Sequence, residues 1–164
     1  MNSIGISPWI GDWAWSLPLI VLTVVIHTCG LALIGGKFVD VFGESLDNHR
    51  FLPKFATVIG GTALLATLLH GIEAAIWGVA YRFLGALPDS RSAMLYSLSA
   101  MTTYGHENLF LQDHWKLMGA LEALNGMLLF GLSTAFLFAM IQRVWPLGER
   151  HRELSVPFSS PMNR

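Results

Sequence analysis

The sequence predicts an all-α membrane protein with three transmembrane helices and a short re-entrant helix and loop between the second and the third. Its composition is 53% hydrophobic and only 13% charged, about half the charged share of a typical soluble domain. Three apolar runs are long enough to cross a bilayer. A short apolar segment, followed by a polar glycine-containing stretch, lies between the last two runs.

The three runs span residues 16–36, 55–81 and 115–145. A helix needs about 20 mostly apolar residues to cross the hydrocarbon core, and each run meets that length. Tryptophans lie mostly near the ends of these runs, where aromatic belts meet the membrane interface. They are Trp9, Trp13, Trp15, Trp77, Trp115 and Trp145.

The distribution of positive charge predicts the orientation. No lysine or arginine precedes Lys37, whereas basic residues flank the other ends of the spans at Arg50, Lys54 and Arg143. The positive-inside rule places the N-terminus outside and the C-terminus in the cytoplasm, as expected for a multi-pass protein of the cell membrane. The N-terminus lacks the basic region of a signal peptide, so we expect the first span to be retained.

The chain divides into three predicted parts. Residues 1–54 hold the first transmembrane helix and a cytoplasmic linker, 55–145 hold the second and third spans with the segment between them, and 146–164 form a short cytoplasmic tail. A net charge of −1 without a basic patch argues against nucleic-acid binding. The single cysteine, Cys29, forms no intramolecular disulfide, and we expect it to be buried as a small apolar residue.

The segment SAMLYSLSAM, residues 92–101, is apolar but too short to cross the membrane. Pro88 and Asp89, which are residue types that favour turns, precede it, and Ser90 or Ser92 is the candidate N-cap. We therefore expect a helix of about ten residues. It either re-enters the membrane or lies on the outer surface, and hydropathy alone leaves both options open.

The residues after this segment, TTYGHEN (102–108), resemble the filter T-T-V-G-Y-G-D of the potassium-channel superfamily. Downstream, LMGALEALNGMLLFGLSTAFLF (117–138) looks like the inner helix of small bacterial ion-channel-domain proteins, which read LEAxNGxLxFGxSTAxLF. The resemblance covers roughly residues 55–142. It implies a pore helix and filter loop, a homotetramer among membrane lipids, and a central path lined by the last helix.

The resemblance places six residues in the filter: Thr102, Thr103, Tyr104, Gly105, His106 and Glu107. Glu107 stands where the second filter glycine belongs, and a residue other than glycine at positive φ costs roughly 1–2 kcal/mol. We therefore expect a cation channel that is not strictly potassium-selective and passes potassium, sodium or calcium, with four Glu107 carboxylates at its mouth. Alternatively, Glu107 points into solvent or caps a neighbouring helix. His106 is a candidate pH sensor, a metal ligand or a structural histidine.

Several ionisable or polar residues fall inside the spans. His70 and Glu73, like Glu122 and Asn125, are three positions apart and share a helix face, and His27 lies midway along the first span. We expect the carboxylates to pair internally with a histidine, with Asn125 or with the backbone. Three alternatives remain: a metal- or haem-binding oxidoreductase using His27, His70 and Glu73; a proton-coupled transporter using the two glutamates; and a non-conducting structural subunit. We find no enzyme motif and expect no cofactor beyond the permeant cation.

The last span contains two glycines, Gly126 and Gly131, that allow two interpretations. Small residues allow transmembrane helices to approach closely, and a glycine also permits a bend. The sequence therefore leaves both positions as sites of close packing or as a gating hinge.

Overall fold

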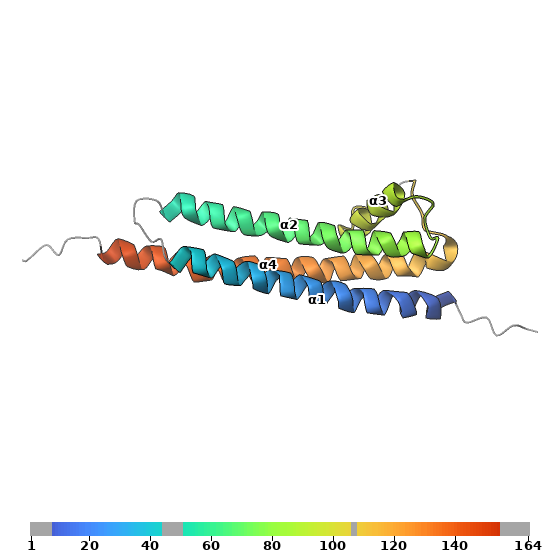
Figure 1. Ribbon diagram of the computed structural model, residues 1–164, viewed down its shortest axis with the longest axis horizontal. Helices are drawn as coiled ribbons and strands as arrows, with labels where there is room; N and C mark the ends of the chain where they lie inside the picture. The colour runs from blue at the N-terminus through green and yellow to red at the C-terminus, as the bar shows by residue number, and fades with distance from the viewer. Residues whose placement is uncertain (1–7, 44–50, 106–107, 155–164) are drawn as a thin grey trace, which may run out of the picture.

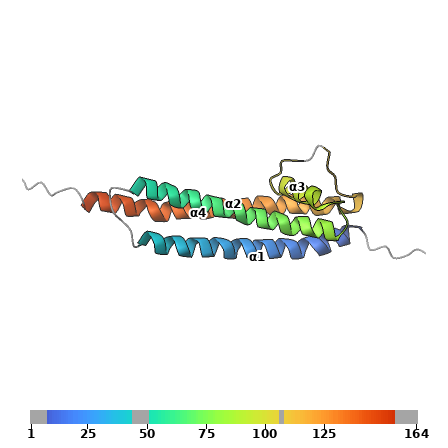
Figure 2. The ribbon, with the colours of Figure 1, turned by 45° about the horizontal axis from the view of Figure 1, so that its top comes forward.

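In the part of the chain that the structure describes, three long helices lie side by side in an elongated bundle, and one short α-helix packs against one end of it (Figures 1 and 2). This computed structural model describes residues 8–43, 51–105 and 108–154, and the side chains of residues 9–37, 52–105 and 108–143. The elements are α1 (Pro8–Gly43), α2 (Phe51–Phe83), α3 (Ser90–Met101), the 3-10 turn η2 (Asp113–Trp115) and α4 (Lys116–Leu154). Residues 44–50, within the predicted linker, and the predicted tail beyond residue 154 lie outside the described residues.

Among the described residues, three segments are long and apolar enough to cross a membrane: Trp9–Lys37 in α1, Leu52–Phe83 in α2, and Asp113–Arg143, which covers η2 and most of α4. Within the described ranges, every regular element is helical. The prediction of an all-α chain with three candidate membrane spans is therefore confirmed. Large apolar side chains are exposed around the bundle, among them Val21, Leu33, Leu64, Val79 and Phe138, as expected of helices whose outer faces meet lipid. Cys29 is exposed on α1, so the expectation of a buried cysteine is wrong for the single chain.

The short helix α3 begins one residue after Asp89, which is its N-cap. The Asp89 side chain accepts a hydrogen bond from the Ser92 backbone N–H at 2.9 Å, and its own backbone is extended. The predicted N-caps Ser90 and Ser92 are thus wrong, because Ser90 is already helical and Ser92 contributes the donor. This hydrogen bond from the Ser92 backbone lowers the pKa of the Asp89 carboxyl below its ordinary value.

α3 runs back along the bundle against α2 and α4. Near its start, Gly78 of α2 faces the backbone of Ala93, where an added Cβ would lie 3.5 Å from the Ala93 carbonyl. At its end, Met101 packs with Ala74 of α2 and Leu129 of α4. Gly126 of α4 lies still closer, since a Cβ there would lie 2.7 Å from the Met101 Cα. Glycine at position 126 therefore permits close contact between the end of α3 and α4.

A larger apolar cluster fixes the other end of α3 and the connection that leads to it. Its buried members are Trp77, Tyr81, Ala86, Leu87, Ala93, Leu111 and Met118. These residues come from α2, the α2–α3 connection, α3, the segment before η2 and α4. The cluster therefore positions α3 and the segment that follows it relative to the long helices.

Candidate functional site

The predicted filter residues begin at the C-terminus of α3. The N–H of Thr103 donates to the Ala100 carbonyl and that of Tyr104 donates to the Ser99 carbonyl, both at 3.0 Å. With Thr102 as C-cap, this is a Schellman motif. Thr103 occupies its left-handed position with φ 55°, where glycine is usual and a β-branched residue is an outlier. Such a conformation costs roughly 1–2 kcal/mol, so the rest of the structure must hold it in place.

The residues at and after this cap are exposed. Thr102, Thr103, Tyr104 and Gly105 are all exposed, and the Tyr104 side chain is 87% accessible. Gly105 has φ 86°, which is the conformational freedom expected of a filter glycine. An open hollow of about 820 Å³ lies beside these residues, lined by Ser92, Leu95, Ser99, Tyr104, Gly105, Asn108 and Leu109. His106 and Glu107, the other two predicted filter residues, lie outside the described residues.

Behind α3, the buried Glu122 of α4 joins three helices. Its Oε2 accepts a hydrogen bond from the Tyr81 hydroxyl of α2 at 2.6 Å, and its Oε1 contacts the Ser97 hydroxyl of α3. Ser97 also donates to the Ala74 carbonyl at 2.7 Å. One hydroxyl proton serves one acceptor at a time, so both contacts are satisfied when Glu122 is a neutral acid that donates to Ser97. A neutral acid avoids burying an unpaired charge.

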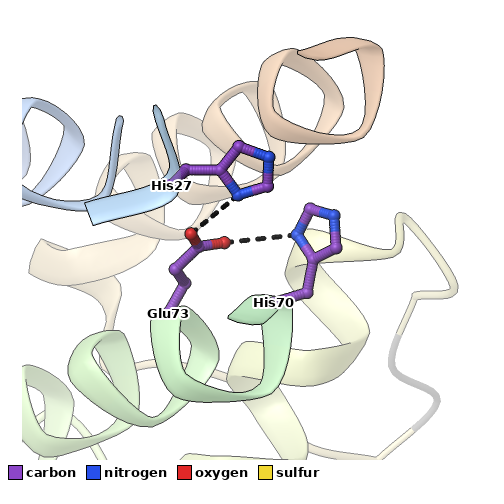
Figure 3. A group of neighbouring side chains, drawn as sticks. All are labelled: His27, His70 and Glu73. Atoms are coloured by element: carbon purple, nitrogen blue, oxygen red, sulfur yellow. Dashed lines mark hydrogen bonds and ion pairs between the residues drawn. The ribbon is translucent and has the colours of Figure 1, made fainter. Parts of the chain in front are cut away.

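A second buried cluster joins α1, α2 and α4 farther along the bundle. Figure 3 shows the carboxyl group of Glu73 between two imidazole rings, His27 from α1 and His70 from α2. His27 Nδ1 lies 2.8 Å from Glu73 Oε1, and His70 Nδ1 lies 3.2 Å from Oε2. Ser133 Oγ of α4 closes the ring, 3.1 Å from the Nε2 atom of each histidine. Glu73 and His27 have no exposed surface.

The four contacts of this ring are not equivalent. Three meet the geometry of a hydrogen bond, whereas His70 Nδ1 and Glu73 Oε2 are close but not aligned for one. Four protons, one per contact, correspond either to a neutral carboxylic acid with two neutral imidazoles or to a carboxylate with one imidazolium and one neutral imidazole, in each case together with the Ser133 hydroxyl. In both states the ring carries no net charge, which suits a site within an apolar bundle.

Asn125 and the two glycines of α4 have separate environments. The Asn125 amide donates to the Thr23 hydroxyl of α1 at 2.9 Å, so Asn125 faces α1 although Glu122 faces α2 and α3. Gly126 is in close contact with α3, as described above. Gly131 has nothing within 4 Å of an added Cβ. The geometry favours close packing at Gly126 and shows no close neighbour at Gly131, where a gating hinge stays a prediction.

Sequence reasoning missed three hydroxyl residues of these clusters as partners of the carboxyl groups: Tyr81, Ser97 and Ser133. Hydroxyl side chains are common in membrane helices, where they bond to their own backbone, as Thr28 and Thr134 do. Their pattern therefore gave no signal that distinguishes a cluster member. The expected pairing of Glu73 with a histidine is present, whereas Glu122 pairs with hydroxyls and not with a histidine or Asn125.

The alternative of haem binding by His27 and His70 does not fit this geometry well. The rings of His27 and His70 lie in contact, with centroids 4.9 Å apart, and His70 stacks on Phe130 at 4.2 Å. A macrocycle between the two imidazoles requires them to separate. The cluster therefore favours hydrogen bonding or ligation of a single ion.

No protein-family model matches this sequence, and no curated protein or solved structure is significantly similar to it. The functional reasoning therefore depends on the geometry of the chain itself.

Proposed function

We propose that the chain forms a homotetrameric pore-loop cation channel that is not strictly potassium-selective. In this proposal α3 is a re-entrant pore helix, residues 102–107 line the filter, and α4 lines the inner cavity. The observation that carries the proposal is the exposed, non-helical segment from Thr102 to Gly105, which follows a helix end packed against α2 and α4 well inside their candidate membrane spans.

The depth of the helix end supports this reading. Met101 lies against Gly126, about ten residues after the start of α4 at Lys116. At a rise of about 1.5 Å per residue, this is roughly 15 Å along the helix, or about half of a hydrocarbon core of about 30 Å. A helix lying on the outer surface would not reach this level, so the packing favours the re-entrant option.

An exposed, non-helical segment at that depth has to be protected from contact with lipid. Non-helical backbone within a membrane is tolerated where protein buries it or where it lines a water-filled cavity. The single chain leaves Thr102, Thr103 and Gly105 exposed, and four copies around an axis supply both conditions. This need for shelter supports the proposed tetramer.

The polar groups of the segment suit a cation. The N–H groups of Thr102, Thr103 and Tyr104 donate back into α3, so the carbonyls are the groups that this segment offers to an ion. The C-terminal end of α3 adds the partial negative charge of the helix dipole. Carbonyls that replace the hydration shell are the basis of potassium-channel filters, and a carboxylate ring of Glu107 at the mouth would further favour cations.

Flux measurements test the proposal. Purified protein reconstituted in liposomes should pass potassium and sodium, and Gly105→Ala should reduce this flux because its φ of 86° disfavours a side chain. Gly71→Ala is the matched control, since an added Cβ there meets nothing within 4 Å. Glu107→Gly should shift the preference toward potassium. If the protein forms tetramers that pass no ions, the result would support a non-conducting structural subunit. If it is a monomer that passes no ions, the result would contradict both the channel and the structural-subunit hypothesis.

A further inference from the structure

The His27–Glu73–His70 cluster gathers three ligand-type atoms at one buried point. Both Nδ1 atoms face the Glu73 carboxyl group, at 2.8 Å and 3.2 Å. One ligand atom from each of the three residues lies within 4.8 Å of the other two. Two imidazoles and one carboxylate are the protein ligands of many catalytic zinc sites. The residue types and their convergence are therefore those of a transition-metal site.

A second observation is the poor hydrogen bonding at the centre of the cluster. Glu73 Oε2 and His70 Nδ1 are buried and make no aligned hydrogen bond, although they lie 3.2 Å apart. Buried polar atoms are normally satisfied, and an unsatisfied one costs roughly 1–3 kcal/mol. An ion between these two atoms would satisfy both at once.

Ser133 supplies the outer contact that a metal site requires. Its Oγ lies 3.1 Å from Nε2 of both His27 and His70, and a hydroxyl oxygen accepts two hydrogen bonds. When both Nε2 atoms donate to Ser133, both Nδ1 atoms present lone pairs toward Glu73. Metal-binding histidines characteristically donate their second N–H to an oxygen in this way.

We infer that His27 Nδ1, His70 Nδ1 and the Glu73 carboxylate bind one divalent ion of the zinc class, with Ser133 orienting both rings. Two ligand atoms at about 2.0–2.2 Å from one tetrahedral ion lie roughly 3.3–3.6 Å apart, so His27 Nδ1 and the Glu73 carboxylate, now 2.8 Å apart, must separate slightly to admit it. The ion takes the place of the proton that Glu73 shares with the two imidazoles and connects α1 to α2. The inference does not depend on the proposed channel function, since every ligand comes from one chain.

Cobalt(II) binding tests the inference on the full chain in detergent, after EDTA treatment and dialysis. Wild type should bind one cobalt ion per chain, with the visible absorption of a low-symmetry nitrogen and oxygen site. Glu73→Gln should lose this band, and Ser133→Ala should weaken binding by about 10–100-fold. Glu122→Gln is the matched control, because it makes the same change at a carboxyl group surrounded by hydroxyls and should bind like wild type.

Two results would overturn the inference. One is wild-type protein that takes up no more cobalt than a folded Glu73→Gln variant. The other is a Glu122→Gln variant that loses cobalt to the same extent as Glu73→Gln. If Glu73→Gln does not fold, X-ray absorption of zinc-loaded wild type decides: two imidazoles around the ion support the site, and oxygen ligands alone refute it.

Discussion

Glu73 and Glu122 are both fully buried carboxyl groups on helices that are long and apolar enough to span a membrane, yet their neighbours differ in kind. Glu73 lies between two imidazoles, which accept or release protons, whereas Glu122 lies between the hydroxyls of Tyr81 and Ser97. Hydroxyls donate to a carboxyl group but supply no charge to balance it. The first environment supplies the ligand types of a metal site, and the second supplies only hydrogen-bond partners. The two clusters also differ in what they join, since Glu73 links the long helices and Glu122 secures α3.

Replacing each glutamate by leucine should give the largest difference between the two clusters. Glu73→Leu leaves both buried histidines without their carboxyl partner, and we expect a loss of about 3–5 kcal/mol. Glu122→Leu leaves the Tyr81 hydroxyl unpaired, while Ser97 keeps the Ala74 carbonyl, so we expect about 1–3 kcal/mol. Unfolding in detergent measures both changes. A larger loss for Glu122→Leu would reverse the comparison.

The contact that places α3 against α4 should be sensitive to a single methyl group. Gly126→Ala would overlap the backbone of Met101, and we expect a loss of about 1–3 kcal/mol together with reduced flux. Gly131→Ala meets no atom within 4 Å and should stabilise α4 slightly, by up to about 1 kcal/mol. Equal effects of the two substitutions on thermal unfolding would show that α3 does not pack as described.

Removing one hydroxyl from the Glu122 cluster should have a moderate effect. Tyr81→Phe deletes the hydrogen bond to Glu122 but keeps the ring among its apolar neighbours, so we expect a loss of about 1 kcal/mol. Tyr104→Phe is the matched control, because that side chain is 87% exposed and its hydroxyl should contribute nothing to unfolding in detergent. A neutral result at Tyr81 would mean that Glu122 does not depend on this donor.

The smallest effect should come from Asp89, the exposed N-cap of α3. Its pKa is lowered from the ordinary value of 3.8 because the carboxylate accepts the Ser92 N–H. The folded-state pKa therefore lies below the unfolded one, so its contribution to stability is present at neutral pH and disappears as pH falls through the folded pKa. Asp89→Asn should show a smaller loss of melting temperature between pH 7 and pH 3 than wild type. An identical loss would argue against the cap.

The spans were predictable because a bilayer demands a length and composition that few soluble segments share. The short helix was also predictable, but its N-cap was not, since Asp89, Ser90 and Ser92 all have capping side chains and only the backbone distinguishes them.

The contact of Glu73 with His70 follows from their spacing on one helix. Its contact with His27 does not, because 46 residues separate them and only the packing of α1 decides it.

The partners of Glu122 could not be predicted from the sequence either. Glu122 and Asn125 share a helix face by spacing, yet one faces α3 and the other Thr23 of α1. Two side chains three residues apart on one helix can therefore contact different neighbouring helices. Sequence periodicity therefore identified buried polar positions on α4 without identifying their partners.

A density map of the purified protein in lipid nanodiscs tests the central claim most directly. We expect four copies with Thr102–Gly105 around a common axis and cation density along it. A single chain, or an assembly in which Thr102–Gly105 faces away from any shared axis, would contradict the proposed channel.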